Sequence, residues 1–146
     1  MTNDFPVSVG AETKFSKTVS ESDVYLFAGI TGDLSPNHVN AEVMRGTKYG
    51  RRIAHGALLV GYMSNCSSVL CARFDTPGET AVSLGYDRIR FIAPVFIGDT
   101  ITITYRVAEI DPAKRQTKAD VRVTARGGEL CAVATHILRW VANPPE

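Results

Sequence analysis

The sequence predicts an α+β fold in which a curved antiparallel β-sheet wraps around one long, buried α-helix. Helical patterns lie in the first half of the 146-residue chain and strand patterns in the second half. Residues 57–71 contain no charged side chain, so a helix there must be covered on every side. Four later segments alternate polar with apolar residues, which is typical of an antiparallel sheet covered on one face.

The length and charge of the chain limit its organisation and its partners. We expect a single domain over residues 1–146, with its core at about residues 10–141. A formal net charge of +1 argues against nucleic acid or an anionic membrane surface as a partner. The chain start lacks a signal-peptide pattern, and no apolar stretch approaches the ~20 residues of a membrane span. We therefore expect a cytoplasmic protein.

The first predicted elements are a strand and a helix. Residues 9–19 form a weak strand pattern with Phe15 and Val19 on one parity. Ser20, with Asp23 three residues later, resembles a capping box and predicts a helix start. Gly32 is well placed to end that helix. The inward face of this helix carries Val24, Phe27 and Ala28.

A loop over residues 32–38 follows, because Pro36 prevents a helix from passing through it. Asn40 then caps a short helix that extends through Met44. The next helix, residues 57–71, is ~23 Å long at ~1.5 Å per residue. Helical spacing places two sets of residues on separate faces of it: Leu59, Met63, Cys66 and Leu70 on one, and Gly56, Val60 and Ser64 on the other.

The second half of the chain predicts four strands, at residues 83–91, 100–110, 117–126 and 130–141. Gly127-Gly128 joins the last two as a tight hairpin. Their one-sided apolar pattern suits a sheet that covers the central helix. Part of the helix surface and a sheet edge are left open, so we expect a homodimer or a higher homo-oligomer.

Asp33 and His38 are the first candidates for chemistry. A carboxylate and an imidazole five residues apart are held in a loop by a glycine and a proline. Histidine titrates near neutrality, and a carboxylate beside it can orient it or share a water with it. Turn and cap roles are the alternatives for both residues. His55 and His136 are interpreted as structural residues, at a helix start and within a strand.

Gly56 and Ser64 are the next candidates. The start of a buried helix presents unpaired N–H groups, and a glycine there lets an acyl oxygen approach the backbone. Tight packing is the alternative reason for Gly56. Ser64 lies two turns further on, near the same face. Nucleotide-binding and metal-binding patterns are absent from the sequence, so we expect acid–base chemistry with no cofactor and no metal.

These residues resemble the MaoC-like (R)-specific enoyl-CoA hydratases, a hot-dog-fold family. Residues 27–38 (FAGITGDLSPNH) and 49–58 (YGRRIAHGAL) look like its hydratase motif, and residues 91–100 (FIAPVFIGDT) resemble the strand–turn–strand segment that follows. The resemblance implies reversible syn addition of water to a trans-2-enoyl-CoA thioester. It makes Asp33 and His38 the catalytic pair.

The same resemblance assigns the thioester carbonyl to the Gly56 N–H and places Ser64 in the lining of the active site. Ser35 departs from the family, which often has asparagine before the proline.

Two other functions remain open. One is a hot-dog acyl-CoA thioesterase; such enzymes often carry a carboxylate on the central helix, and residues 57–71 have none. The other is a dehydratase subunit or acyl-binding module that acts on acyl carrier protein or on branched or dicarboxylic acyl-CoA. A non-catalytic subunit would be expected to lack the acid or the base, and this chain has both.

Overall fold

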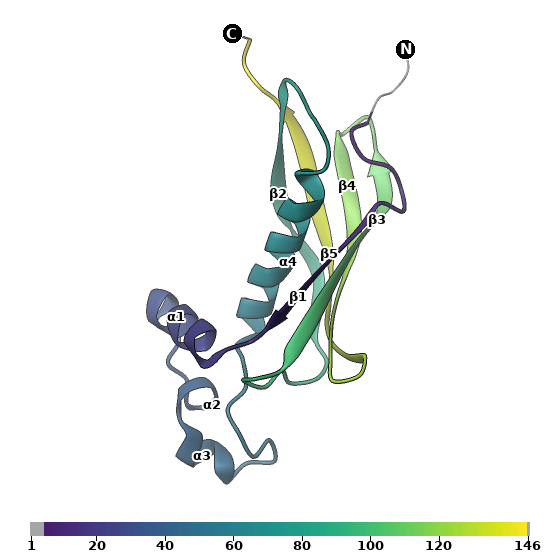
Figure 1. The fold of residues 1–146 in the computed structure, drawn as a ribbon. Helices are drawn as coiled ribbons and strands as arrows, with labels where there is room; N and C mark the ends of the chain where they lie inside the picture. Colours follow the sequence, from purple (N-terminus) through teal and green to yellow (C-terminus); the bar gives the residue numbers. More distant parts are fainter. Residues whose placement is uncertain (1–4, 146) are drawn as a thin grey trace.

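A computed structural model describes residues 5–145 of the chain (Figure 1). It contains five strands and four helices in the described part. The strands are β1 (Glu12–Thr18), β2 (Glu79–Phe91), β3 (Thr100–Asp111), β4 (Gln116–Ala125) and β5 (Glu129–Ala142). The helices are α1 (Glu21–Thr31), α2 (Pro36–Val39), α3 (Ala41–Arg45) and α4 (Gly56–Cys71).

The five strands form one antiparallel sheet in the order β1-β3-β4-β5-β2. The long helix α4 lies along one face of this sheet, and the three short helices gather near the start of α4 (Figure 1). Inward residues alternate along β3 and β4 as the sequence predicts. The buried ones are Ile101, Ile103, Tyr105, Val107, Ala119, Val121, Val123 and Ala125. The predicted α+β hot-dog architecture is confirmed.

The helix α4 buries one stripe against the sheet. The buried residues are Leu59, Met63, Cys66, Ser67 and Leu70, which contain the whole predicted stripe. The opposite surface of α4 is exposed within the single chain, and Val69 keeps 40% of its surface in solvent. The sheet therefore covers one side of the helix. That a second copy of the chain covers the exposed face of α4 in a homodimer stays a prediction.

The segment before α4 follows its predicted capping signals with one exception. The Ser20 hydroxyl accepts from the Asp23 N–H and the Asp23 carboxylate accepts from the Ser20 N–H, so the capping box is confirmed. The prediction of a loop over residues 32–38 is wrong in its second half, because α2 begins at Pro36. Proline suits the first position of a helix, where its fixed φ is already helical and no N–H is needed.

The edge strand β2 contains two β-bulges. Its register against β5 shifts between Ser83 and Gly85, and again between Asp87 and Arg90. Each shift adds one residue to β2 relative to β5, so the side chains beyond it change face. Arg88, in the second bulge, has a left-handed φ of 54°. A simple alternation therefore does not describe this strand.

The two bulges decide which β2 side chains face α4. Three of them stand opposite buried residues of β5: Ser83 opposite Leu138, Tyr86 opposite His136, and Phe91 opposite Ala132. All three consequently lie on the inner face of the sheet. Within residues 5–145, no helix is both long enough and apolar enough to cross a membrane.

Candidate active site

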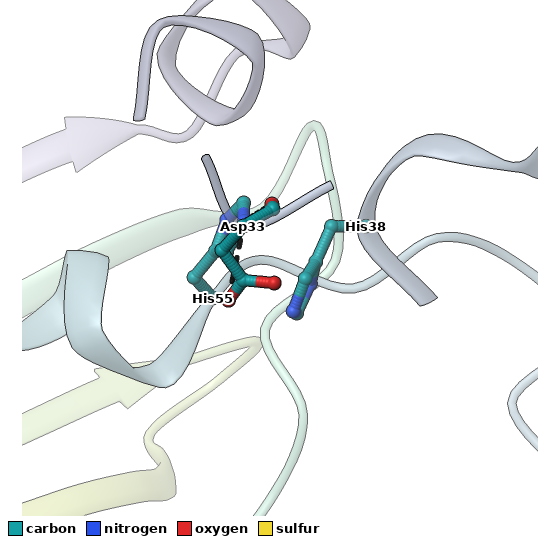
Figure 2. A group of neighbouring side chains, drawn as sticks. All are labelled: Asp33, His38 and His55. Atoms are coloured by element: carbon teal, nitrogen blue, oxygen red, sulfur yellow. Dashed lines mark hydrogen bonds and ion pairs between the residues drawn. The ribbon is translucent and has the colours of Figure 1, made fainter. Parts of the chain in front are cut away.

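Asp33 and His38 are held by the ends of two helices that meet beside the start of α4. Gly32 closes α1 in a left-handed conformation, with φ 78° and its N–H bonded to the Ala28 carbonyl. This turn directs the chain to Asp33, whose side-chain oxygen accepts from the Ser35 N–H at 3.3 Å. Pro36 then begins α2 and places His38 on it. Figure 2 shows the Asp33 carboxylate directed toward the His38 ring.

The hydrogen bond of His38 fixes which ring nitrogen carries hydrogen. Nδ1 lies 2.8 Å from the Ile53 carbonyl oxygen, and a carbonyl oxygen can only accept. Nδ1 is therefore the donor, which leaves Nε2 of the neutral ring as an acceptor. His38 is buried, with 8% of its surface exposed. Its free nitrogen can bind or receive a proton from a group beside it.

His55, which the sequence suggests is only structural, joins the same group. Its Nε2 donates to the Asp33 carbonyl oxygen at 3.0 Å, and its ring stacks on His38 with centroids 3.7 Å apart. Phe27 packs on His55 with centroids 4.7 Å apart. His55 therefore fixes both the backbone of Asp33 and the plane of His38. Spacing along the chain carries no signal for this contact.

The three side chains lie at a separation that suits a bridging water. A carboxylate oxygen of Asp33 and one ring nitrogen from each of His38 and His55 lie within 4.8 Å of one another. Two hydrogen bonds to one water span ~4.6 Å. A carboxylate with two imidazoles is also a metal donor set. The His55 Nε2 beside Asp33 already donates its hydrogen to a carbonyl, which favours acid–base chemistry over metal binding.

Gly56 begins α4 and leaves donors unused. Within residues 5–145, neither its N–H nor that of Ala57 has a hydrogen-bond acceptor. The start of a 16-residue helix also carries the positive end of the helix dipole. A carbonyl oxygen brought to this point would meet two N–H groups. The glycine itself is explained by packing, because a Cβ at this position would lie 2.6–2.8 Å from the Phe91 ring.

A cavity of about 380 Å³ is lined both by His38 and by the start of α4. His38, Gly56 and Phe91 all line it, whereas Asp33 and Ser64 do not. The Asp33 carboxylate reaches within 4.8 Å of a ring nitrogen of His38, which does line it. Its other lining residues are Asn37, Tyr49, Ile53, Ala54, Ala57, Leu59, Ile92, Ala93, Pro94 and Val95. A larger hollow of about 530 Å³ lies over outward-facing residues of the sheet and contains no predicted site residue.

Ser64 is the predicted site residue that the structure does not bring into the group. It is exposed on α4, eight residues beyond Gly56, which is ~12 Å along the helix. Sequence reasoning also missed Phe91 and Tyr49 as lining residues. Phe91 is in the motif-like segment 91–100, but its contact with Gly56 joins distant parts of the chain and leaves no signal in the sequence.

A second cluster, formed by His136, Tyr105 and Ser83, lies in the core, away from this cavity. Tyr105 Oη and Ser83 Oγ each lie 2.8 Å from a ring nitrogen of His136. His136 is fully buried, and this burial lowers its pKa to about 4. Burial also raises the pKa of Tyr105. These groups fill the interior as neutral side chains, as predicted for His136 in its strand.

Known proteins resemble the chain in sequence and in fold. A model of the MaoC like domain matches residues 4–128. An (R)-specific enoyl-CoA hydratase of Rhodospirillum rubrum is 41% identical over 109 residues, which cover 75% of this chain and 72% of the relative. A 3-hydroxybutyryl-CoA dehydratase of Methylorubrum extorquens is 38% identical over 112 residues, with coverage of 77% and 68%.

A solved structure extends this similarity to the whole fold. The (R)-hydratase from Aeromonas caviae, involved in PHA biosynthesis, superposes with a TM-score of 0.81 at 26% identity. The match covers 91% of this chain and 96% of that protein.

Proposed function

The chain belongs to the MaoC-like domain family, and we propose that it is an (R)-specific enoyl-CoA hydratase/dehydratase. Such a hydro-lyase reversibly adds water to a trans-2-enoyl-CoA and forms an (R)-3-hydroxyacyl-CoA. One observation carries the proposal: the Asp33 carboxylate and a ring nitrogen of His38 lie within 4.8 Å, with the cavity beside them.

The two acceptors account for how a water would be oriented. The water donates one hydrogen to the Asp33 carboxylate and the other to the free Nε2 of His38. Its lone pairs then point away from both, toward C3 of a bound enoyl thioester. As the C3–O bond forms, the proton that the water loses passes through the pair to C2. Delivery from the same side gives syn addition.

The start of α4 accounts for stabilisation of the developing charge. Attack at C3 moves negative charge onto the thioester oxygen. The unpaired N–H groups of Gly56 and Ala57 are already oriented, so they bind that oxygen without reorganisation. Ser64 is proposed to contact a more distant part of the acyl group. The single domain and the homodimer expected from the sequence are part of the same proposal.

The absence of a carboxylate on the central helix favours hydration over thioester hydrolysis. α4 contains neither Asp nor Glu, so no acid of this helix can act as the base or nucleophile of a thioesterase. The acid of the proposed pair lies instead on the turn after α1, next to the imidazole. That position suits water held for addition to a double bond.

The direct test uses the purified chain and crotonyl-CoA. We expect loss of the ultraviolet absorbance of the enoyl thioester, and chiral analysis of the product should give the (R)-3-hydroxy form. Free thiol is measured in the same reaction to detect hydrolysis. Absence of hydration across short and medium acyl chains would contradict the proposal. Release of free CoA without hydration would support the thioesterase instead.

A further inference from the structure

Phe91 is an exposed aromatic residue at the end of β2 that the proposed chemistry does not yet use. Its side chain keeps 55% of its surface in solvent, although it stands on the inner face of the sheet. Two bulges of β2 precede this residue, and the second, between Asp87 and Arg90, returns the side chains to the face that the first had reversed. With the first bulge alone, Phe91 would face away from α4. Bulges often occur next to active sites, where they direct a side chain toward the site.

The Phe91 ring packs directly on the first residue of α4. A Cβ added to Gly56 would lie 2.6 Å from Cε2, 2.7 Å from Cζ and 2.8 Å from Cδ2 of the ring. Gly56 does not have a positive φ, so its backbone conformation is open to any residue. The ring is therefore the structural reason for glycine here. It also lies beside the two unpaired N–H groups.

Phe91 and His38 approach the cavity from opposite sides of the segment that leads into α4. On one side, the Ile53 N–H donates to the Asn37 carbonyl and the Ile53 carbonyl accepts from His38. On the other side, the Ala54 N–H donates to the Val95 carbonyl at 2.7 Å. The segment from Phe91 to Val95 thus flanks this backbone opposite α2.

The backbone after Phe91 is held to the sheet. The N–H groups of Ile92 and Ala93 both donate to the Cys131 carbonyl, at 2.7 and 3.2 Å. These hydrogen bonds hold the backbone next to Phe91 in place, and with it the position of the ring. An acyl group whose oxygen reaches the Gly56 N–H must lie alongside it.

We propose that Phe91 is a substrate-positioning residue whose flat ring supports the face of the enoyl thioester turned away from His38. This proposal rests on the hydratase function proposed above. The conjugated thioester is planar from its carbonyl to C3, so it can lie flat on an aromatic ring. A saturated acyl group is not planar there and fits the ring less well. Phe91 therefore favours the enoyl form in the orientation that water attacks.

The test compares one planar and one saturated ligand of equal length. KM for crotonyl-CoA and the inhibition constant of butyryl-CoA are measured for wild type and for Phe91→Ala, Phe91→Leu and Phe91→Tyr. Leucine keeps apolar bulk but is not flat, whereas tyrosine keeps the ring. Stacking contributes about 0.5–1.5 kcal/mol, or roughly 2- to 13-fold. We expect Phe91→Leu and Phe91→Ala to reduce the preference for crotonyl-CoA by this factor.

Two variants serve as controls for this comparison. Phe91→Tyr should retain the preference to within about twofold, because its ring is still flat. Leu84→Ala removes another exposed apolar side chain of β2, 51% exposed and outside the cavity lining, and should change nothing. A Phe91→Leu variant with the full wild-type preference overturns the proposal, even if its overall activity falls.

A thermal experiment tests the ring contact independently of catalysis. Gly56→Ala should lower Tm in the wild-type background and have little effect in the Phe91→Ala background, because the clash is then gone. Equal effects in both backgrounds would overturn the contact and the proposal. Wild-type protein inactive on crotonyl-CoA would overturn the proposed function and the role of Phe91 together. Active protein with an unchanged ligand preference would overturn only the role of Phe91.

Discussion

Two clusters of side chains in the molecule are built around histidine, one at the start of α4 and one in the core. They differ in the hydrogen-bond partners of the histidine rings. At the start of α4, His38 and His55 donate to backbone carbonyls and lie within 4.8 Å of the Asp33 carboxylate. In the core, His136 is bonded to the hydroxyls of Tyr105 and Ser83. A carbonyl can only accept, so it fixes the tautomer of the ring, whereas a hydroxyl can donate or accept.

The difference has a consequence for protons. His38 has one nitrogen fixed as a donor and the other free beside a cavity. His136 has both nitrogens engaged and no exposed surface, and burial lowers its pKa to about 4. The first arrangement leaves a nitrogen that can exchange a proton with a bound molecule. The second keeps a neutral ring in place. A histidine in a hydrogen-bond network can therefore pass a proton to a ligand only where one nitrogen stays accessible.

Replacement of Asp33 should have the largest effect of the substitutions considered, and the effect should be on activity and not on stability. Asp33→Asn keeps the shape of the side chain but removes the carboxylate that is proposed to accept a proton from water. We expect kcat/KM for crotonyl-CoA to fall by about 10²–10⁴-fold. The side chain is 52% exposed, so Tm should change little. Asp120→Asn, an exposed carboxylate on β4, is the matched control and should keep full activity. An unaffected Asp33→Asn variant would remove Asp33 from the mechanism.

The core cluster should instead influence how stability depends on pH. In the unfolded chain His136 takes up a proton below pH 6.5, but in the folded chain only below about pH 4. Between these values the unfolded state binds more protons, so folding stability falls as the pH drops. The shift corresponds to roughly 3 kcal/mol. Denaturant unfolding of wild type and His136→Gln at pH 7, 5 and 4 should show a smaller acid loss in the variant. If the free energy of unfolding fell equally with pH in both proteins, the proposed contribution of His136 would be contradicted.

Local signals predicted much of the fold. The capping box at Ser20, the left-handed Gly32 and the buried stripe of α4 all depend on residues close in sequence, and the structure has each of them. The alternating strands β3 and β4 follow for the same reason. The spacing also predicted that Asp33 and His38 lie close together, because one turn and one short helix hold both.

Contacts between distant segments could not be predicted in this way. His55 reaches Asp33 across 22 residues, through a bond from a ring nitrogen to a backbone oxygen that leaves no trace in the sequence. Tyr86 faces α4 because β2 gains an extra residue against β5 between Ser83 and Gly85, and the second bulge restores the original alternation at Phe91. A bulge reverses the alternation from which a strand face is inferred, so an alternation that starts at Ser83 assigns Tyr86 to the wrong face.

The smallest expected effect is that of replacing His55, and it tests how this residue positions Asp33 and His38. His55→Phe keeps an aromatic ring to stack on His38 but loses the hydrogen bond to the Asp33 carbonyl. The bond contributes about 0.5–1.5 kcal/mol to holding Asp33 in place, so its loss should reduce kcat by at most roughly 2- to 13-fold. Folding stability should change less, because the substitution also removes His55 Nδ1, a buried nitrogen with no partner among the described residues.

The kinetic constants and Tm of His55→Phe, measured beside those of His55→Leu, decide between three roles. Leucine removes the stacking as well as the hydrogen bond, so a larger loss with leucine means that the ring holds His38 in its plane. Equal losses would assign the whole effect to the bond with Asp33. A His55→Phe loss as large as that of Asp33→Asn would contradict a positioning role, because only a group that itself transfers the proton could account for it.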